Sequence, residues 1–192
     1  MTLGENKKIT LTLIEEYSPT NQYLTDDEDI KNRINLIYAP NYQEVAQLKK
    51  ILTTKTLMEN SGENPEGYAE YALPKDMYQL KNVICLDDDN IRIKPNYYLI
   101  GNKIYISNKN EYQHILEYYK YPTVITEHTL DSFELEVDQD AKMNLCYLVA
   151  NDILKVDPSA NYTAFLSEYQ RKKQEWDTRR ELPSVVVEEG VI

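Results

Sequence analysis

A tight hairpin near the middle of the chain is the strongest local constraint on the fold. Residues 97–106 form two short runs of mainly apolar and tyrosine residues on either side of Gly101 and Asn102. Two such runs joined by a two-residue turn are typical of a β-hairpin, because glycine adopts a positive φ at no steric cost. A strand-like run at 71–83 and another after the hairpin extend this prediction to a small antiparallel sheet within residues 71–126.

Helical patterns precede the predicted sheet. Thr25 followed by Glu28 matches a capping box, in which two backbone N–H groups at the start of a helix are satisfied by side chains. Pro40 interrupts the apolar face that follows, and because proline removes a helix hydrogen bond we expect a break or kink there. Helical spacing then resumes, so the sequence predicts N-terminal helices over residues 7–53.

Helical patterns also follow the predicted sheet. Asp138 is a suitable N-cap for one helix, and Asp157 with Pro158 is a start signal for a longer second one, which together predict helices over 138–180. The tail at 181–192 is apolar, β-branched and too short to fold alone. The predicted fold class is therefore α+β, a helical bundle with a small antiparallel β-sheet insertion and an extended C-terminal tail.

The length of the chain fits one domain. Its 192 residues can form a core over 1–192 without a metal or a disulfide. No apolar run approaches the roughly 18 residues needed to span a bilayer, so we expect no membrane association. Residues 1–8 lack the basic and apolar regions of a secretory signal, which predicts a cytosolic site of synthesis. Cys85 and Cys146 lie among apolar residues without a close partner and are interpreted as reduced core thiols.

The sequence carries no recognisable catalytic motif. Nucleophile-elbow, nucleotide-binding and metalloprotease patterns are absent, and five glycines are too few for a glycine-built phosphate cradle. Residues 87–89 resemble the start of a calcium loop, but Arg92 stands where that loop needs glycine and Tyr98 where it needs glutamate. We therefore predict no catalytic residues, no cofactor, no metal and no enzymatic activity.

The charge balance is strongly acidic. With 32 acidic and 21 basic residues the formal net charge is −11, which repels a phosphate backbone and argues against non-specific nucleic-acid binding. Such a protein could mimic DNA or line a channel through which DNA slides, and the alternative is that the acidity serves only solubility. Seventeen tyrosines against two phenylalanines suit half-wet subunit contacts, although codon bias in an AT-rich genome would give the same composition.

One basic cluster stands out near the end of the last predicted helix. Its members are Arg171, Lys172, Lys173, Arg179 and Arg180, and cations are favoured at a helix C-terminus because they complement the helix dipole. Two interpretations remain open, a solvated helix end and a surface for an acidic partner.

The order of these features resembles that of tailed-phage head-to-tail adaptor proteins, also called connector or head-completion proteins, including the tubular tail protein A type. Four segments carry the resemblance. They are a helical pair at 26–52, the Leu-Pro-x-Asp segment at 73–77, the hairpin at 98–106, and the Tyr-Tyr-x-x-Pro strand end at 118–122 that leads to the last helices and the tail.

The resemblance implies a structural virion protein at the head–tail junction, assembled in the host cytoplasm. About twelve copies would form a ring beneath the portal protein, extend the DNA channel without binding DNA specifically, and present a platform for tail proteins. The residues it implies as portal or subunit contacts are Arg171, Lys172, Lys173, Trp176, Arg179, Leu182, Val185, Val186 and Val187. The alternative functions are an acidic DNA mimic or another protein-binding module, with an enzyme as a third class.

Overall fold

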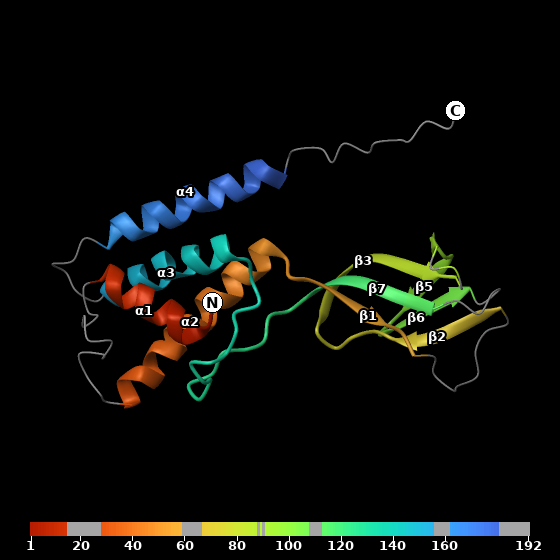
Figure 1. Cartoon of the computed structure of the whole chain (residues 1–192), viewed down its shortest axis with the longest axis horizontal. Helices are drawn as coiled ribbons and strands as arrows, with labels where there is room; N and C mark the ends of the chain where they lie inside the picture. The colour runs from red at the N-terminus through yellow and green to blue at the C-terminus, as the bar shows by residue number, and fades with distance from the viewer. Residues whose placement is uncertain are drawn as a thin grey trace. The chain divides into compact units, whose positions relative to one another are not determined.

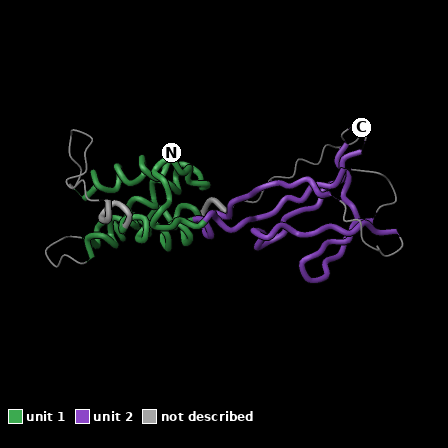
Figure 2. The backbone as a smooth tube through the Cα atoms, turned by 90° about the horizontal axis from the view of Figure 1, so that it is seen from below, with its two compact units in different colours: residues 1–45, 124–192 green, residues 46–123 purple. Residues whose placement is uncertain are grey.

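The chain divides into two compact units, which we call the helical unit (residues 1–45 and 124–192) and the β unit (residues 46–123; Figure 2). The structure is a computed structural model, and the residues that it describes are 1–14, 28–58, 67–87, 89, 91–107, 113–155 and 162–180, with the backbone alone at 28–32 and 177–180. The sequence predicts one domain with an insertion from residue 71. In the structure the inserted unit begins at residue 46.

Four helices in the described residues build the helical unit, with the last turn of α2 crossing into the β unit (Figure 1). Their bounds are α1 Leu3–Leu13, α2 Glu28–Lys49, α3 Gln139–Leu154 and α4 Thr163–Arg180. Helix α3 contacts both α1 and α4. Side chains that α1, α2 and α3 bury completely include Leu3, Tyr38, Tyr42, Ala141, Leu145 and Val149.

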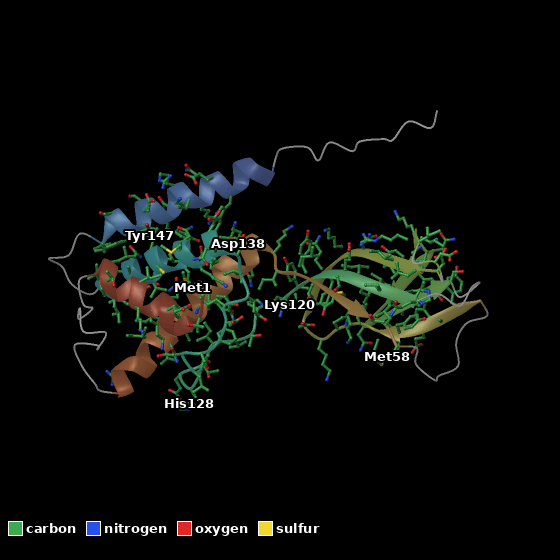
Figure 3. The ribbon with its side chains drawn as sticks, viewed as in Figure 1. Met1, Met58, Lys120, His128, Asp138 and Tyr147 are labelled. Atoms are coloured by element: carbon green, nitrogen blue, oxygen red, sulfur yellow. The ribbon has the colours of Figure 1, made fainter. Side chains whose placement is uncertain are left out.

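Local capping fixes the starts of two of these helices. Helix α1 has a capping box in which Thr2 Oγ1 accepts from the Glu5 backbone N–H at 3.2 Å and the Thr2 N–H donates to Glu5 Oε2 at 2.8 Å. Asp138 caps α3 as predicted, since its Oδ1 accepts from the Ala141 N–H at 2.8 Å (Figure 3). The cap predicted at Thr25 lies outside the described residues.

Helix α2 continues through Pro40, so of the predicted break or kink the break is wrong, and the kink stays a prediction. Proline deprives the carbonyl four residues earlier, that of Leu36, of its helical donor. Both Leu36 and Pro40 are exposed, so this carbonyl lies on the solvent side of the helix where water can satisfy it. The predicted apolar face is therefore retained across the proline.

The β unit contains two antiparallel sheets. The first has the strand order β1-β7-β3-β4 and the second β2-β6-β5. The strand bounds are β1 Leu52–Thr56, β2 Tyr68–Ala72, β3 Met77–Leu86, β4 Arg92–Ile93, β5 Tyr97–Ile100, β6 Lys103–Ser107 and β7 Gln113–Lys120. One hydrophobic cluster joins the sheets, formed by Leu57, Ala69, Tyr71, Val83, Cys85, Ile104, Ile106, Leu116 and Tyr118.

The hairpin prediction is confirmed, and the boundaries around it are corrected. Gly101 has φ +59° and Asn102 has no positive φ, which is the pattern of a type II′ turn. The run at 71–83 is not one strand. It ends β2 and begins β3, which belong to different sheets, and Pro74 lies in the break because proline cannot donate to a ladder. Strand β1, at 52–56, lies wholly outside the predicted sheet of 71–126, because the sequence places residues 52 and 53 in the N-terminal helices and 54–56 in no predicted element.

Truncating Ile104 should destabilise the β unit strongly, whereas truncating its hairpin neighbour Ile100 should not. Ile104 is fully buried and Ile100 is 60% exposed. We expect Ile104→Ala to lower the free energy of unfolding by about 2–5 kcal/mol, because the cavity cannot refill. The matched control Ile100→Ala should cost less than about 1 kcal/mol. Urea unfolding followed by fluorescence measures both, and equal losses would contradict this core assignment.

Candidate interaction surfaces

The cations predicted on the last helix are paired within that helix. Arg171 Nη2 lies 2.5 Å from Glu168 Oε1, its Nε donates to Glu168 Oε2 at 3.0 Å, and its Nη1 pairs with Glu175. These are i,i+3 and i,i+4 neighbours on an exposed helix face. The hydrogen bond from Arg171 lowers the pKa of Glu168 below its usual value.

The two lysines of the cluster also have acidic neighbours. Lys172 Nζ lies 3.9 Å from Glu175 Oε2, and Lys173 Nζ lies 3.9 Å from Glu44 Oε1 on α2. Exposed pairs at these distances contribute little stability, but they cancel much of the local positive potential. The described part of the cluster therefore favours the interpretation of a solvated, ion-paired helix end over a strongly cationic surface.

Trp176 is corrected from a contact residue to a packing residue. It is only 5% exposed and lies where α4 packs on α3. Two hydrogen bonds hold the same helix in place: the Asn144 amide donates to the Tyr169 carbonyl at 3.3 Å, and the Tyr169 hydroxyl donates to Glu44 Oε1 at 2.6 Å. Burial, together with that last bond, raises the pKa of Tyr169 well above its usual value.

Several predicted contacts lie outside the described residues. They are the side chain of Arg179 and the tail residues Leu182, Val185, Val186 and Val187. Their assignment as contacts stays a prediction.

A pocket of about 240 Å³ lies between α3 and α4. Asp140 and Tyr147 line it from α3, and Lys172 and Glu175 line it from α4. Charged side chains of both signs therefore line the pocket, which suits a polar contact.

Acidic residues elsewhere in the described part of the chain serve local structure. Asp87 Oδ1 accepts the backbone N–H groups of Asp89 at 3.0 Å and Ile91 at 2.8 Å, which closes a turn. The described residues contain no group of three or more histidine, cysteine, aspartate or glutamate side chains placed to hold a metal ion.

Sequence reasoning missed a second surface, which we call the β4–β5 edge and define as residues 91–100. Five of its side chains are large, apolar or aromatic, and exposed: Ile91, Ile93, Tyr97, Leu99 and Ile100. Arg92 and Lys94 are exposed between them, and the segment contains no acidic residue although the chain is strongly acidic. The signal was present in the sequence, since Tyr-Tyr-Leu-Ile leaves neither face of β5 polar in the way that a solvated strand face is.

Tyrosines gather on the outer face of the second sheet. The ring centroids of Tyr98 lie 5.1 Å from Tyr68 and 4.9 Å from Tyr105, and the Tyr105 hydroxyl donates to Glu70 Oε2 at 2.8 Å. Lys103 pairs with the same carboxylate at 2.7 Å. Such half-wet aromatic rows suit contact surfaces. The use of tyrosine for subunit contacts stays a prediction.

Comparison of the chain with protein-family models and with curated proteins finds no match. Among the described helices, none is long and apolar enough to cross a membrane. The function therefore has to be argued from the surfaces above and from the order of the elements.

Removing the Arg171 guanidinium should raise the pKa of Glu168. Because the folded-state pKa is lowered, the interaction stabilises the helix above the ordinary glutamate pKa and is lost as pH falls through the lowered value. We expect Arg171→Met to return the pKa of Glu168 towards that of a free glutamate, measured by NMR titration. Lys8→Met, on exposed α1 surface, is the control. An unchanged Glu168 in the Arg171 variant would contradict the pairing.

Both thiols should be unreactive in the folded protein. Burial raises the pKa of Cys85 and of Cys146 to about 11, so the thiolate fraction at pH 8 is very small and reagents are also excluded sterically. We expect disulfide reagents to label neither residue within the time in which a free thiol reacts completely, and to label both once urea unfolds the chain. Rapid labelling of the folded protein would show that the cores open.

Proposed function

We propose that this chain is a structural protein of a tailed-phage virion, a head-to-tail adaptor that forms a ring beneath the portal protein. In this role it joins the head to the tail proteins and extends the channel through which DNA passes. The observation that carries the proposal is the element order. A β unit is inserted between α2 and α3 of a helical unit, which is the helix–sheet–helix order of the adaptor resemblance, although the helical pair expected at 26–52 is the single helix α2 followed by β1.

The segments that carry the resemblance occupy defined places in this fold. The Leu-Pro-x-Asp segment at 73–77 joins β2 to β3, the hairpin at 98–106 is β5–β6, and the segment at 118–122 ends β7 on the way to α3. One segment connects two strands, one is a hairpin, and one ends a strand. That placement supports the resemblance as one of fold order as well as of sequence.

Two physical properties suit a ring around DNA. A closed ring needs two different surfaces on each copy, because its contacts are heterologous, and this chain offers an ion-paired helical face and an apolar strand edge. A net charge of −11 gives a wall that repels the phosphate backbone.

A DNA mimic is the second candidate, and the described charges support it less. A mimic needs a row of acidic side chains that are free to imitate phosphates. Instead, Glu70, Asp131, Glu168 and Glu175 each pair with a lysine or arginine of the same chain. Competition with DNA for a DNA-binding protein would test this alternative directly.

Mixing the full chain with the portal protein of the same genome tests the proposal. We expect a ring on the portal, seen as a single larger particle by light scattering and as an added layer in negative-stain images. A chain that remains a monomer and ignores the portal would contradict the adaptor function.

A charge-reversal pair sharpens this test. Lys172→Glu with Lys173→Glu should weaken portal binding about tenfold if that helix face contacts the portal. Lys8→Glu with Lys155→Glu makes the same change in net charge at exposed positions of the helical unit and should leave binding unchanged. Equal effects of the two pairs would assign the change to overall charge.

A further inference from the structure

The β4–β5 edge is an open side of the β unit. Among the described strands, β5 pairs only with β6 and β4 pairs only with β3, so each is the last strand of its sheet. The two edges are joined by residues 94–96 alone. Exposed strand edges carry unpaired backbone groups and readily accept a further strand.

The backbone of β5 offers defined hydrogen-bonding groups at this edge. The Ser107 N–H donates to the Asn96 carbonyl at 2.9 Å, which places Asn96 in a hydrogen-bonded pair with β6. In an antiparallel ladder such pairs alternate, so Tyr98 and Ile100 also bond to β6. The N–H and C=O groups of Tyr97 and Leu99 therefore point away from β6, towards the open side.

Two side chains of β5 lie in cross-strand rows with buried core residues but are themselves exposed. Tyr97 is in register with Ile106 and Leu99 with Ile104, and these two isoleucines are fully buried. Cross-strand partners share one face of a sheet, so Tyr97 and Leu99 lie on the core-facing side. They are nevertheless 38% and 48% exposed. One further strand beside β5 would cover them.

The tail has the composition of such a strand. Residues 184–189 read Ser-Val-Val-Val-Glu-Glu, in which three β-branched residues with high strand propensity are followed by two acids. The recipient edge has the complementary charge. Arg92 and Lys94 are exposed and precede β5 in the chain, and no described acidic residue forms an ion pair with either.

We propose that residues 184–189 of one copy add to β5 of a second copy as an antiparallel strand, with Val185 opposite Leu99 and Val187 opposite Tyr97. This register pairs the tail with the outward N–H and C=O groups of Tyr97 and Leu99. It also places the two valines next to these exposed side chains, on the core-facing side of the sheet. The choice of a second copy rests on the proposed function, in which copies are neighbours in a ring.

Charge selects the antiparallel direction. An antiparallel strand places Glu188 and Glu189 beyond Asn96, on the side of Lys94. A parallel strand would bring the two acids to the hairpin end instead, where Lys103 already pairs with Glu70 at 2.7 Å. The added strand is thus oriented as well as positioned by the edge.

Cysteine cross-linking between differently tagged full-length chains tests the proposal. One chain carries Leu99→Cys and the other Val185→Cys, and opposed residues in an antiparallel pair lie within disulfide reach. The native cysteines are buried and stay out of the reaction. Val186→Cys is the matched control, because a neighbouring position points to the other face of the sheet. We expect at least about fivefold more hybrid dimer with Val185→Cys, a margin set by this opposite facing.

A charge swap gives a second readout. Glu188→Lys with Glu189→Lys should reduce the cross-linked product about tenfold, and Arg92→Glu with Lys94→Glu in the recipient should restore it. Absence of cross-linking, tested both in the free mixture and on the portal, overturns the proposal. So does a disulfide that forms only when both cysteines are on one chain and is independent of concentration, since the tail would then bind its own copy.

The outcome separates this inference from the proposed function. Ring formation on the portal without the Leu99–Val185 cross-link would leave the adaptor function standing and remove the strand addition. Cross-linking in the free mixture by a chain that does not bind the portal would support the strand addition and contradict the adaptor function.

Discussion

The buried amide of Asn6 is the contact on which the helical unit depends. Its Oδ1 accepts from the Tyr38 hydroxyl at 2.9 Å and its Nδ2 donates to the Lys142 carbonyl at 2.7 Å, so one side chain joins α1, α2 and α3. The Tyr38 hydroxyl also shares a hydrogen bond with Thr10 at 2.6 Å. The whole β unit separates α2 from α3 in sequence, and closing so long a loop has an entropic cost that contacts of this kind must offset. A buried amide without partners would be strongly unfavourable, so the network forms only when all three helices are in place.

Close backbone contacts between the start of α1 and residues 131–133 also hold the helical unit together. The N–H groups of Leu3 and Gly4 donate to the carbonyls of Phe133 and Asp131 at 2.7 and 2.9 Å, which satisfies groups that the start of α1 leaves open. A Cβ at Gly4 would lie 2.8 Å from the Cβ of Asp131, so only glycine fits without displacing that segment. Buried Lys7 then pairs with the Asp131 carboxylate at 2.6 Å. The N-terminal helix is thereby fixed to the segment that re-enters the helical unit after the β unit.

The features that sequence predicted correctly are those decided within a few residues. The turn at Gly101 needs a positive φ, the cap at Asp138 needs one carboxylate three residues before an open N–H, and both lie where expected. Tertiary context decided the rest. Pro40 is tolerated because its side of α2 faces solvent, and Trp176 is buried because α4 lies on α3. Which side of α2 faces solvent and which helix covers Trp176 are not visible in local periodicity.

The same distinction explains why the basic cluster is conspicuous in the sequence and the β4–β5 edge is not. A run of arginine and lysine is conspicuous in an acidic sequence, but the acids that neutralise Arg171 and Lys173 come from neighbouring helical turns and from α2, which only folding brings close. Arg92 and Lys94 are fewer and less conspicuous, yet no described acidic residue pairs with either of them, and they lie in a segment that is otherwise apolar and exposed. At physiological salt the attraction between exposed charges is screened beyond about 8 Å. Backbone hydrogen bonds of an added strand, together with the burial of the apolar side chains beneath it, do not depend on salt in this way. In the proposed assembly, a strand added at the backbone edge of β5 would therefore contribute more than the helix face whose cations are already paired within the chain.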